Sequence, residues 1–105
     1  MTIDHYNRMT PGEAERFAML AEECAEVIQI IGKILRHGPN SYNPNDQYQT
    51  PNSELLEKEL RDVFAVTMGM ETAGDICVLD QHRSVISTAI WHKKLPWTHH
   101  QSREF

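Results

Sequence analysis

The stretch LAEECAEVIQIIGKILRHG, from Leu20 to Gly38, decides the fold, because its apolar residues recur with the period of an amphipathic helix. At about 100° per residue, one side of this helix is an apolar arc centred on Leu20. The arc contains Phe17, Met19, Cys24, Val27, Ile28, Ile30, Ile31, Ile34 and Leu35. Three acids lie in or beside it: Glu23 falls inside the arc, Glu26 falls at its edge, and Glu22 lies further toward solvent.

Both ends of this helix carry recognisable signals. Thr10 is suited to the N-cap, Pro11 to the first helical position, and Glu13 completes a capping box. Gly38 is suited to the C-cap, and a proline follows it. The sequence therefore predicts a helix from Pro11 to about His37.

A long polar connection follows. Residues 38–53 are rich in Asn and Pro, have almost no apolar side chains and are predicted to form a loop. Tyr42 and Tyr48 in this loop are either ordinary exposed tyrosines or residues that stack on a base. A second helix is predicted to begin near Asn52 or Ser53.

The second half of the chain is also helical by pattern. The second helix is predicted to end near Thr72, before the breaker Gly74. A third helix is expected over about Ile76–Leu95, with Asp75 as its N-cap, and the tail 96–105 is expected to be flexible. No segment reads as a strand, so the prediction is one all-α domain over residues 1–105, a helical hairpin plus a third helix.

Composition excludes several classes of protein. The 105 residues are 40% hydrophobic, which favours a folded domain, and the net charge of −5 argues against a nucleic-acid-binding module. No apolar run approaches a membrane span and the first residues show no signal-peptide core, so a cytoplasmic protein with no membrane partner is expected. Cys24 and Cys77 are expected to be reduced core thiols rather than a disulfide.

The second helix repeats the acidic pattern of the first. Its apolar arc is centred on Leu60, with Glu59 inside the arc and Asp62 at its edge. The arc consists of Leu55, Leu56, Val63, Phe64, Val66, Met68 and Met70. If the two helices pack antiparallel through these arcs, four carboxylates converge.

Three interpretations of these acids compete. They are solvated flank residues, or they form ion pairs, or they bind a divalent cation. The candidate partners for ion pairs are Lys33, Arg36, Lys58 and Arg61. We favour the cation, because converging carboxylates repel one another unless they are neutralised, and all-oxygen ligation suits Mg²⁺, Mn²⁺ or Ca²⁺.

The two acidic segments resemble a known signature. Residues 22–26, EECAE, match an E-E-x-x-E motif, and residues 59–62, ELRD, match E-x-x-D. Together they resemble the MazG-like all-α nucleoside triphosphate pyrophosphohydrolases, as do the surrounding segment 20–38, LLEKELRDVFAV and KKLPW. The resemblance covers most of residues 17–97. Two features depart from it: Arg61 stands where the family often has Gly, and the loop 38–53 lengthens the spacing between the motifs.

The resemblance implies cleavage of a nucleoside triphosphate between its α and β phosphates, which gives a nucleoside monophosphate and pyrophosphate. It implies a requirement for Mg²⁺, for which Mn²⁺ can substitute, held by Glu23, Glu26, Glu59 and Asp62. Glu22 and Glu23 are the expected catalytic residues, with Glu22 acting either as the base or as an orienter of a ligand. The expected phosphate contacts are Lys33, Arg36, Lys93 and Lys94.

Assembly follows from the width of the first apolar arc. It spans roughly 180°, more than one neighbouring helix covers. A homodimer or tetramer is therefore expected, in which helices of two chains form a four-helix-bundle core. The alternative to an enzyme is a non-catalytic helical oligomeric interaction protein. A di-iron bundle ranks low, because neither motif supplies the histidine that such sites use.

Overall fold

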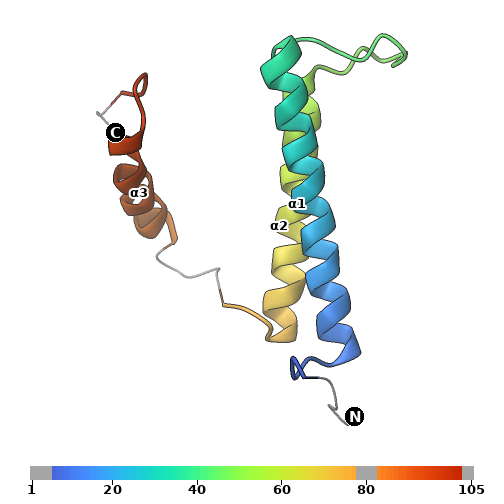
Figure 1. Cartoon of the computed structure of the whole chain (residues 1–105), viewed down its shortest axis with the longest axis vertical. Coiled ribbons are helices and arrows are strands. Elements are labelled where there is room, and N and C mark those ends of the chain that lie inside the picture. The colour runs from blue at the N-terminus through green and yellow to red at the C-terminus, as the bar shows by residue number, and fades with distance from the viewer. Residues whose placement is uncertain (1–5, 78–82, 103–105) are drawn as a thin grey trace.

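The computed structural model describes residues 6–77 and 83–102, and it is all-helical there, with no strand (Figure 1). Its elements are the α-helices α1 (Pro11–His37), α2 (Asn52–Ala73) and α3 (Arg83–Lys94) and the 3₁₀-helix η1 (Leu95–Trp97). The predicted all-α class, with a helical hairpin and a third helix, is therefore confirmed.

The local signals at the ends of α1 act as predicted. The backbone N–H of Glu13 donates to Thr10 Oγ1 at 3.2 Å, and the backbone N–H of Thr10 donates to Glu13 Oε1 at 3.4 Å, which closes the capping box. At the other end, the N–H of Gly38 donates to the carbonyl of Ile34 at 2.7 Å. Gly38 has φ 93°, a conformation that glycine adopts without strain.

The connection and the second helix also follow the pattern. The loop reverses the chain and α2 begins at Asn52, where the N–H donates to the carbonyl of Ser41 at 2.8 Å. The helix ends at Ala73, and Gly74 takes the left-handed conformation with φ 87°. As a result, α1 and α2 lie side by side and antiparallel along their length (Figure 1).

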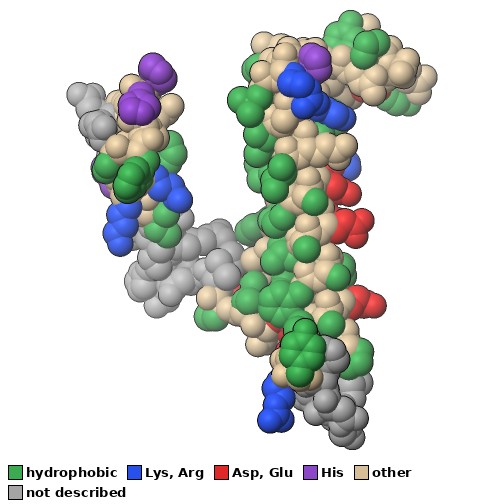
Figure 2. All heavy atoms as spheres, viewed as in Figure 1, with side chains coloured by type: hydrophobic (Ala, Val, Ile, Leu, Met, Phe, Trp, Pro, Cys, Tyr) green, Lys and Arg blue, Asp and Glu red, His purple; other side chains and the backbone are tan. Residues whose placement is uncertain are grey.

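The two helices meet along one edge of each apolar arc rather than along its centre. The most buried apolar residues of the hairpin are Ile30 and Met70, which lie on the same side of their helices as Glu23 and Glu59. The other side of each arc stays exposed, at residues Phe17, Ile28, Ile31, Leu35, Leu60, Phe64 and Met68. Figure 2 shows hydrophobic side chains along this face of the hairpin. The hairpin alone therefore covers only part of its apolar surface.

The prediction for the third helix is wrong at its start. Asp75, Ile76 and Cys77 are not helical, residues 78–82 lie outside the described part, and α3 begins at Arg83. Asp75 does not cap a helix, because its carboxylate binds Arg16 of α1. Among the described elements, α3 contacts only η1.

Two further findings concern surface and thiols. Cys24 and Cys77 are free, as expected, but both are exposed, so their placement in the core was wrong. Cys24 lies on the exposed side of the first arc, which α2 does not cover. None of the described helices is long and apolar enough to cross a membrane.

Candidate metal centre

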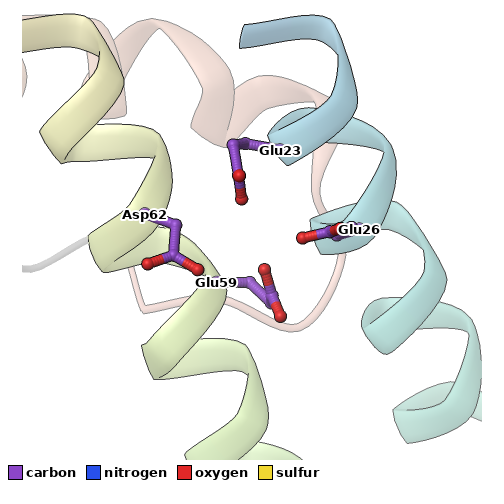
Figure 3. Close-up of side chains that lie close together, drawn as sticks. All are labelled: Glu23, Glu26, Glu59 and Asp62. Carbon is purple, nitrogen blue, oxygen red and sulfur yellow. The ribbon is translucent and has the colours of Figure 1, made fainter. Parts of the chain in front are cut away.

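Four acidic side chains point toward one another between α1 and α2 (Figure 3). Glu23 and Glu26 come from α1, and Glu59 and Asp62 come from α2. One carboxylate oxygen of each residue lies within 4.8 Å of the corresponding oxygens of the other three, and all four residues are partly buried. The structure thus brings together the four residues that the two acidic motifs single out, one acid pair from each helix.

Two oxygen atoms in this cluster are buried without a partner. Glu23 Oε2 and Glu59 Oε2 are inaccessible to solvent and accept no hydrogen bond within the part of the chain that the structure describes. The Glu59 side chain is only 15% exposed. A buried carboxylate oxygen with no hydrogen bond is costly, so these two atoms are suited to bind a cation or to accept a hydrogen bond from water.

The cluster also changes the acidity of its most buried member. The pKa of Glu59 is raised above its ordinary value, first by a hydrogen bond with the Glu26 carboxyl group, then by burial, and then by the negative charge of Glu26. The ammonium group of Lys58 opposes this shift. Glu59 therefore holds a proton more readily than a solvated glutamate, because a proton shared with Glu26 relieves the repulsion between the two carboxyl groups.

Ion pairs account for a small part of the acidic charge. Lys58 Nζ lies 3.9 Å from Glu59 Oε1 and 4.0 Å from Asp62 Oδ2, and its side chain is 65% exposed. These separations are at the upper limit for an ion pair, and one exposed ammonium group cannot neutralise four carboxylates. Within the described residues, neither Lys33 nor Arg36 pairs with the cluster, so the ion-pair interpretation leaves most of the negative charge unbalanced.

Arg61, which departs from the resembled motif, does not come between the helices. Its side chain is 73% exposed and lies 3.9 Å from the carboxylate of Glu57, one turn earlier on α2. The close approach of the two acid pairs therefore does not depend on a small residue at this position.

The donor set fits a divalent cation. Four carboxylates from two helices offer only oxygen, which is the ligand type that Mg²⁺, Mn²⁺ and Ca²⁺ prefer. The orphaned oxygens of Glu23 and Glu59 are the atoms that such an ion would satisfy. The arrangement can hold a metal ion and, through that ion, an anionic substrate.

The remaining predicted site residues lie in three different places. Glu22 is exposed on α1 beside Glu23 and is not part of the converging group. Lys33 and Arg36 line a cavity at the loop end of the hairpin. Lys93 and Lys94 are exposed on α3, which does not contact the hairpin in the described residues, so the structure does not bring them to the acids.

The cavity itself was not predicted. It has a volume of about 560 Å³ and combines Lys33 and Arg36 with loop residues such as Tyr42. Figure 2 shows Lys, Arg and His side chains gathered at this end of the hairpin. The only signal in the sequence was the unusual length of the polar loop, together with its aromatic residues.

Comparisons with known proteins leave the family of this chain open, since no protein-family model, curated protein or solved structure matches it. The likeness of the two acidic motifs to the MazG-like group therefore remains an expectation from the sequence. Function has to be inferred from the chemistry of the four carboxylates and their surroundings.

Proposed function

We propose that this protein is a Mg²⁺-dependent nucleoside triphosphate pyrophosphohydrolase. It cleaves a nucleoside or deoxynucleoside triphosphate between the α and β phosphates and releases a nucleoside monophosphate and pyrophosphate. The observation that carries this proposal is the convergence of the E-x-x-E acids Glu23 and Glu26 with the E-x-x-D acids Glu59 and Asp62 around two buried, unpaired oxygens. The resemblance of both motifs to MazG-like hydrolases supplies the reaction type.

The four carboxylates would hold Mg²⁺, with Mn²⁺ as a substitute. When bound, the ion would supply the positive charge that lets an acidic chain accept a polyphosphate, and it would lower the pKa of a bound water so that hydroxide is available at neutral pH. Glu23 and Glu26 from one helix and Glu59 and Asp62 from the other fix the position of this charge, because each pair is anchored on a rigid helix.

The neighbouring residues serve water and phosphate. Glu22 is solvent-accessible and adjacent to Glu23, so it is placed either to accept a proton from the attacking water or to orient Glu23. Lys33 lies seven residues after Glu26, about two turns along the same face, and Arg36 follows it into the cavity. Both are proposed to neutralise phosphate oxygens of the substrate.

Assembly is part of this proposal. Large apolar side chains on one face of the hairpin, including Ile28 at 69% and Leu35 at 82% exposed, favour a homodimer or a tetramer with a four-helix core. In such an assembly α3 has the opportunity to dock on a hairpin, which would bring Lys93 and Lys94 toward phosphate. Size-exclusion chromatography with light scattering measures the assembly, and a monomer at micromolar concentration contradicts this part.

The decisive experiment is a screen of canonical, deoxy and damaged nucleoside triphosphates with Mg²⁺, scored by pyrophosphate release. Glu59→Gln should abolish release, while Glu57→Gln is the matched control, because Glu57 is an exposed acid on the same helix and outside the cluster. A wild-type protein that releases pyrophosphate from none of the triphosphates contradicts the proposal. Equal losses in both variants would remove Glu59 from the site.

One observation favours a second candidate. The exposed apolar face also suits a non-catalytic helical interaction protein that keeps the hairpin for assembly alone. That protein would form the same oligomer but release no pyrophosphate in Mg²⁺. The orphaned oxygens of Glu23 and Glu59 weigh against it, because an assembly role gives no reason to keep them buried.

A further inference from the structure

A second feature of the hairpin lies outside the acid cluster. The cavity of about 560 Å³ is open to solvent on one side and is lined by the last turns of α1, the loop and the first turn of α2. Its volume falls within the range of small-molecule sites, roughly 300–1,000 Å³. Its lining includes Lys33, Arg36, His37, Tyr42, Asn43 and Asn52.

The two walls of the cavity differ in chemistry. The α1 wall carries the cationic groups of Lys33 and Arg36, which suit phosphate oxygens. The loop wall includes Tyr42, which is 43% exposed, and Asn43. The Oδ1 of Asn43 accepts the backbone N–H of Asn45 at 2.9 Å, so the side-chain NH₂ is the group that it can offer to a ligand. Aromatic faces stack on nucleic-acid bases, and amides read the polar edges of bases. The cavity therefore offers phosphate chemistry on one side and base chemistry on the other.

The cavity lies on the same face of the hairpin as the four acids, about two helical turns nearer the loop. Lys33 follows Glu26 by seven residues, and Asn52 precedes Glu59 by seven, so on both helices the cavity lies on the face of the acids. The separation along each axis is about 10 Å, two helical turns. A nucleoside triphosphate carries its base and its phosphates at opposite ends, which suits two sites spaced along one face.

The loop wall is held in place by its own hydrogen bonds. Asn52 is 5% exposed, its backbone N–H donates to the Ser41 carbonyl at 2.8 Å and its side-chain N–H donates to the Gly38 carbonyl at 3.3 Å. The Asp46 carboxylate accepts the backbone N–H groups of Tyr48 at 2.9 Å and Thr50 at 3.0 Å. Asp46 is thus occupied in shaping the loop, and the wall is formed before any ligand binds.

We propose that this cavity binds the nucleoside part, base and sugar, of the substrate, with the base stacked on Tyr42 and its polar edge toward Asn43. This inference rests on the proposed function, since it assigns the second end of the triphosphate that the acid cluster hydrolyses. It makes the loop 38–51 the determinant of base preference.

The experiment measures binding separately from turnover. The full chain is titrated with each of the four deoxynucleoside monophosphates, and in parallel with inorganic triphosphate, while backbone amide NMR shifts are followed. At least one monophosphate should shift the amides of residues 38–52, and Tyr42→Ala should weaken its binding about tenfold. Inorganic triphosphate should bind Tyr42→Ala as it binds the wild type.

Three further variants control for loss of a loop aromatic ring, for loss of the Tyr42 hydroxyl group and for disturbance of the loop. Tyr48→Ala is the matched control, because Tyr48 lies in the same loop, is 80% exposed and is not in the cavity lining. This variant should bind the monophosphate as tightly as the wild type does. Tyr42→Phe keeps the ring and should keep most of the affinity. If Tyr42→Ala disturbs the loop, the test passes to Asn43→Asp, which keeps the side-chain oxygen that accepts the Asn45 N–H and removes only the NH₂ group. Asn43→Asp must then reduce the preference among the four bases.

The outcomes separate this inference from the proposed function. Monophosphates that shift the loop amides of a protein releasing no pyrophosphate would sink the hydrolase and keep the nucleoside site. Pyrophosphate release with unchanged monophosphate binding in Tyr42→Ala and Asn43→Asp would keep the hydrolase and overturn the nucleoside site. Absence of any monophosphate shift in the loop of the wild type also overturns it.

Discussion

Charged side chains of α1 face the second half of the hairpin at two places, once against α2 and once against Asp75, which follows α2, and the two places are built in opposite ways. At the open end of the hairpin, Arg16 of α1 donates from Nε to Asp75 Oδ2 at 2.6 Å and from a terminal nitrogen to Oδ1 at 2.9 Å. Midway along the hairpin, Glu23 and Glu26 face Glu59 and Asp62. The first contact pairs opposite charges, and the second brings like charges together.

The acidities reflect this difference. The pKa of Asp75 is lowered, chiefly by its hydrogen bonds from Arg16, whereas the pKa of Glu59 is raised, chiefly by its hydrogen bond with Glu26. The Asp75 contact is completed by the chain itself, with a side chain only 3% exposed and fully paired. The acid cluster keeps orphaned oxygens. Acids held together at a cost to stability are typical of functional sites, so the contrast separates a structural contact from a candidate active site.

The largest expected effect is on turnover at the cluster. Glu59→Gln should lower pyrophosphate release by at least about 100-fold, to the background of the assay, because even residues that only support metal ligands cost about 10–100-fold when changed. Asp75→Asn should retain most of the activity at a temperature where it is folded. Steady-state assays of both variants test this, and similar losses in the two would break the distinction between the contacts.

The next effect is on stability with metal. Mg²⁺ should raise the melting temperature of the wild type and of Asp75→Asn, because an ion that binds only the folded state stabilises it. In Glu59→Gln the rise should be much smaller at the same Mg²⁺ concentration. Thermal scans in Mg²⁺ and in chelator provide the measurement. A Mg²⁺ effect that survives in Glu59→Gln would place the ion elsewhere.

The next expected effect is on the pH dependence of stability in metal-free buffer, which should differ between the Arg16–Asp75 contact and the acid cluster. The pKa of Asp75 is lower in the folded state than in the unfolded state. The ionised carboxylate therefore adds to the free energy of unfolding at pH values above its unfolded-state pKa of about 4, and this stabilisation is lost as the pH falls through the folded-state pKa. Wild type should therefore exceed Asp75→Asn in stability at pH 7 and converge with it in acid.

Glu59 should show the opposite sign. Its folded-state pKa is raised, so ionisation destabilises the metal-free fold as pH rises above its unfolded value, about 4.3. Glu59→Gln should then gain on the wild type as pH rises from 4 to 7. Urea denaturation across this range measures both trends, and parallel pH profiles for the two variants would contradict the assignment.

The same division explains what the sequence could predict. The ends of α1 were predictable because Thr10, Glu13 and Gly38 form their capping hydrogen bonds with residues only three or four positions away in the chain. The convergence of the acids followed from helical period, which is also local. Asp75 was misassigned as a cap because its partner Arg16 is 59 residues away in the chain. Nothing near Asp75 in the sequence indicates that contact.

Packing was predictable only in part for a related reason. Helical period identifies an apolar arc but does not say which edge of it a neighbour covers. The edge near Ile30 is buried, while Ile28 on the other side is 69% exposed. The cavity escaped prediction because its loop wall depends on bonds such as that from Asn52 to Ser41, which periodicity does not encode.

The smallest expected effect concerns Lys58, the cation beside the acid cluster. Lys58 partly neutralises Glu59 and Asp62, as Arg16 neutralises Asp75. The interaction of Lys58 is weaker, because its ammonium group is 3.9–4.0 Å from the two carboxylates and its side chain is 65% exposed. Lys58→Ala should therefore tighten Mg²⁺ binding, because it removes a competing positive charge, by no more than about fivefold. Calorimetric titration with Mg²⁺ measures the change.

Arg61→Ala is the matched control on the same helix. Arg61 pairs with Glu57 outside the cluster, so this variant should leave the Mg²⁺ affinity unchanged. Weaker Mg²⁺ binding in Lys58→Ala would mean that the ammonium group helps to position the carboxylates, and the cluster would then be, like the Arg16–Asp75 contact, partly completed by the chain.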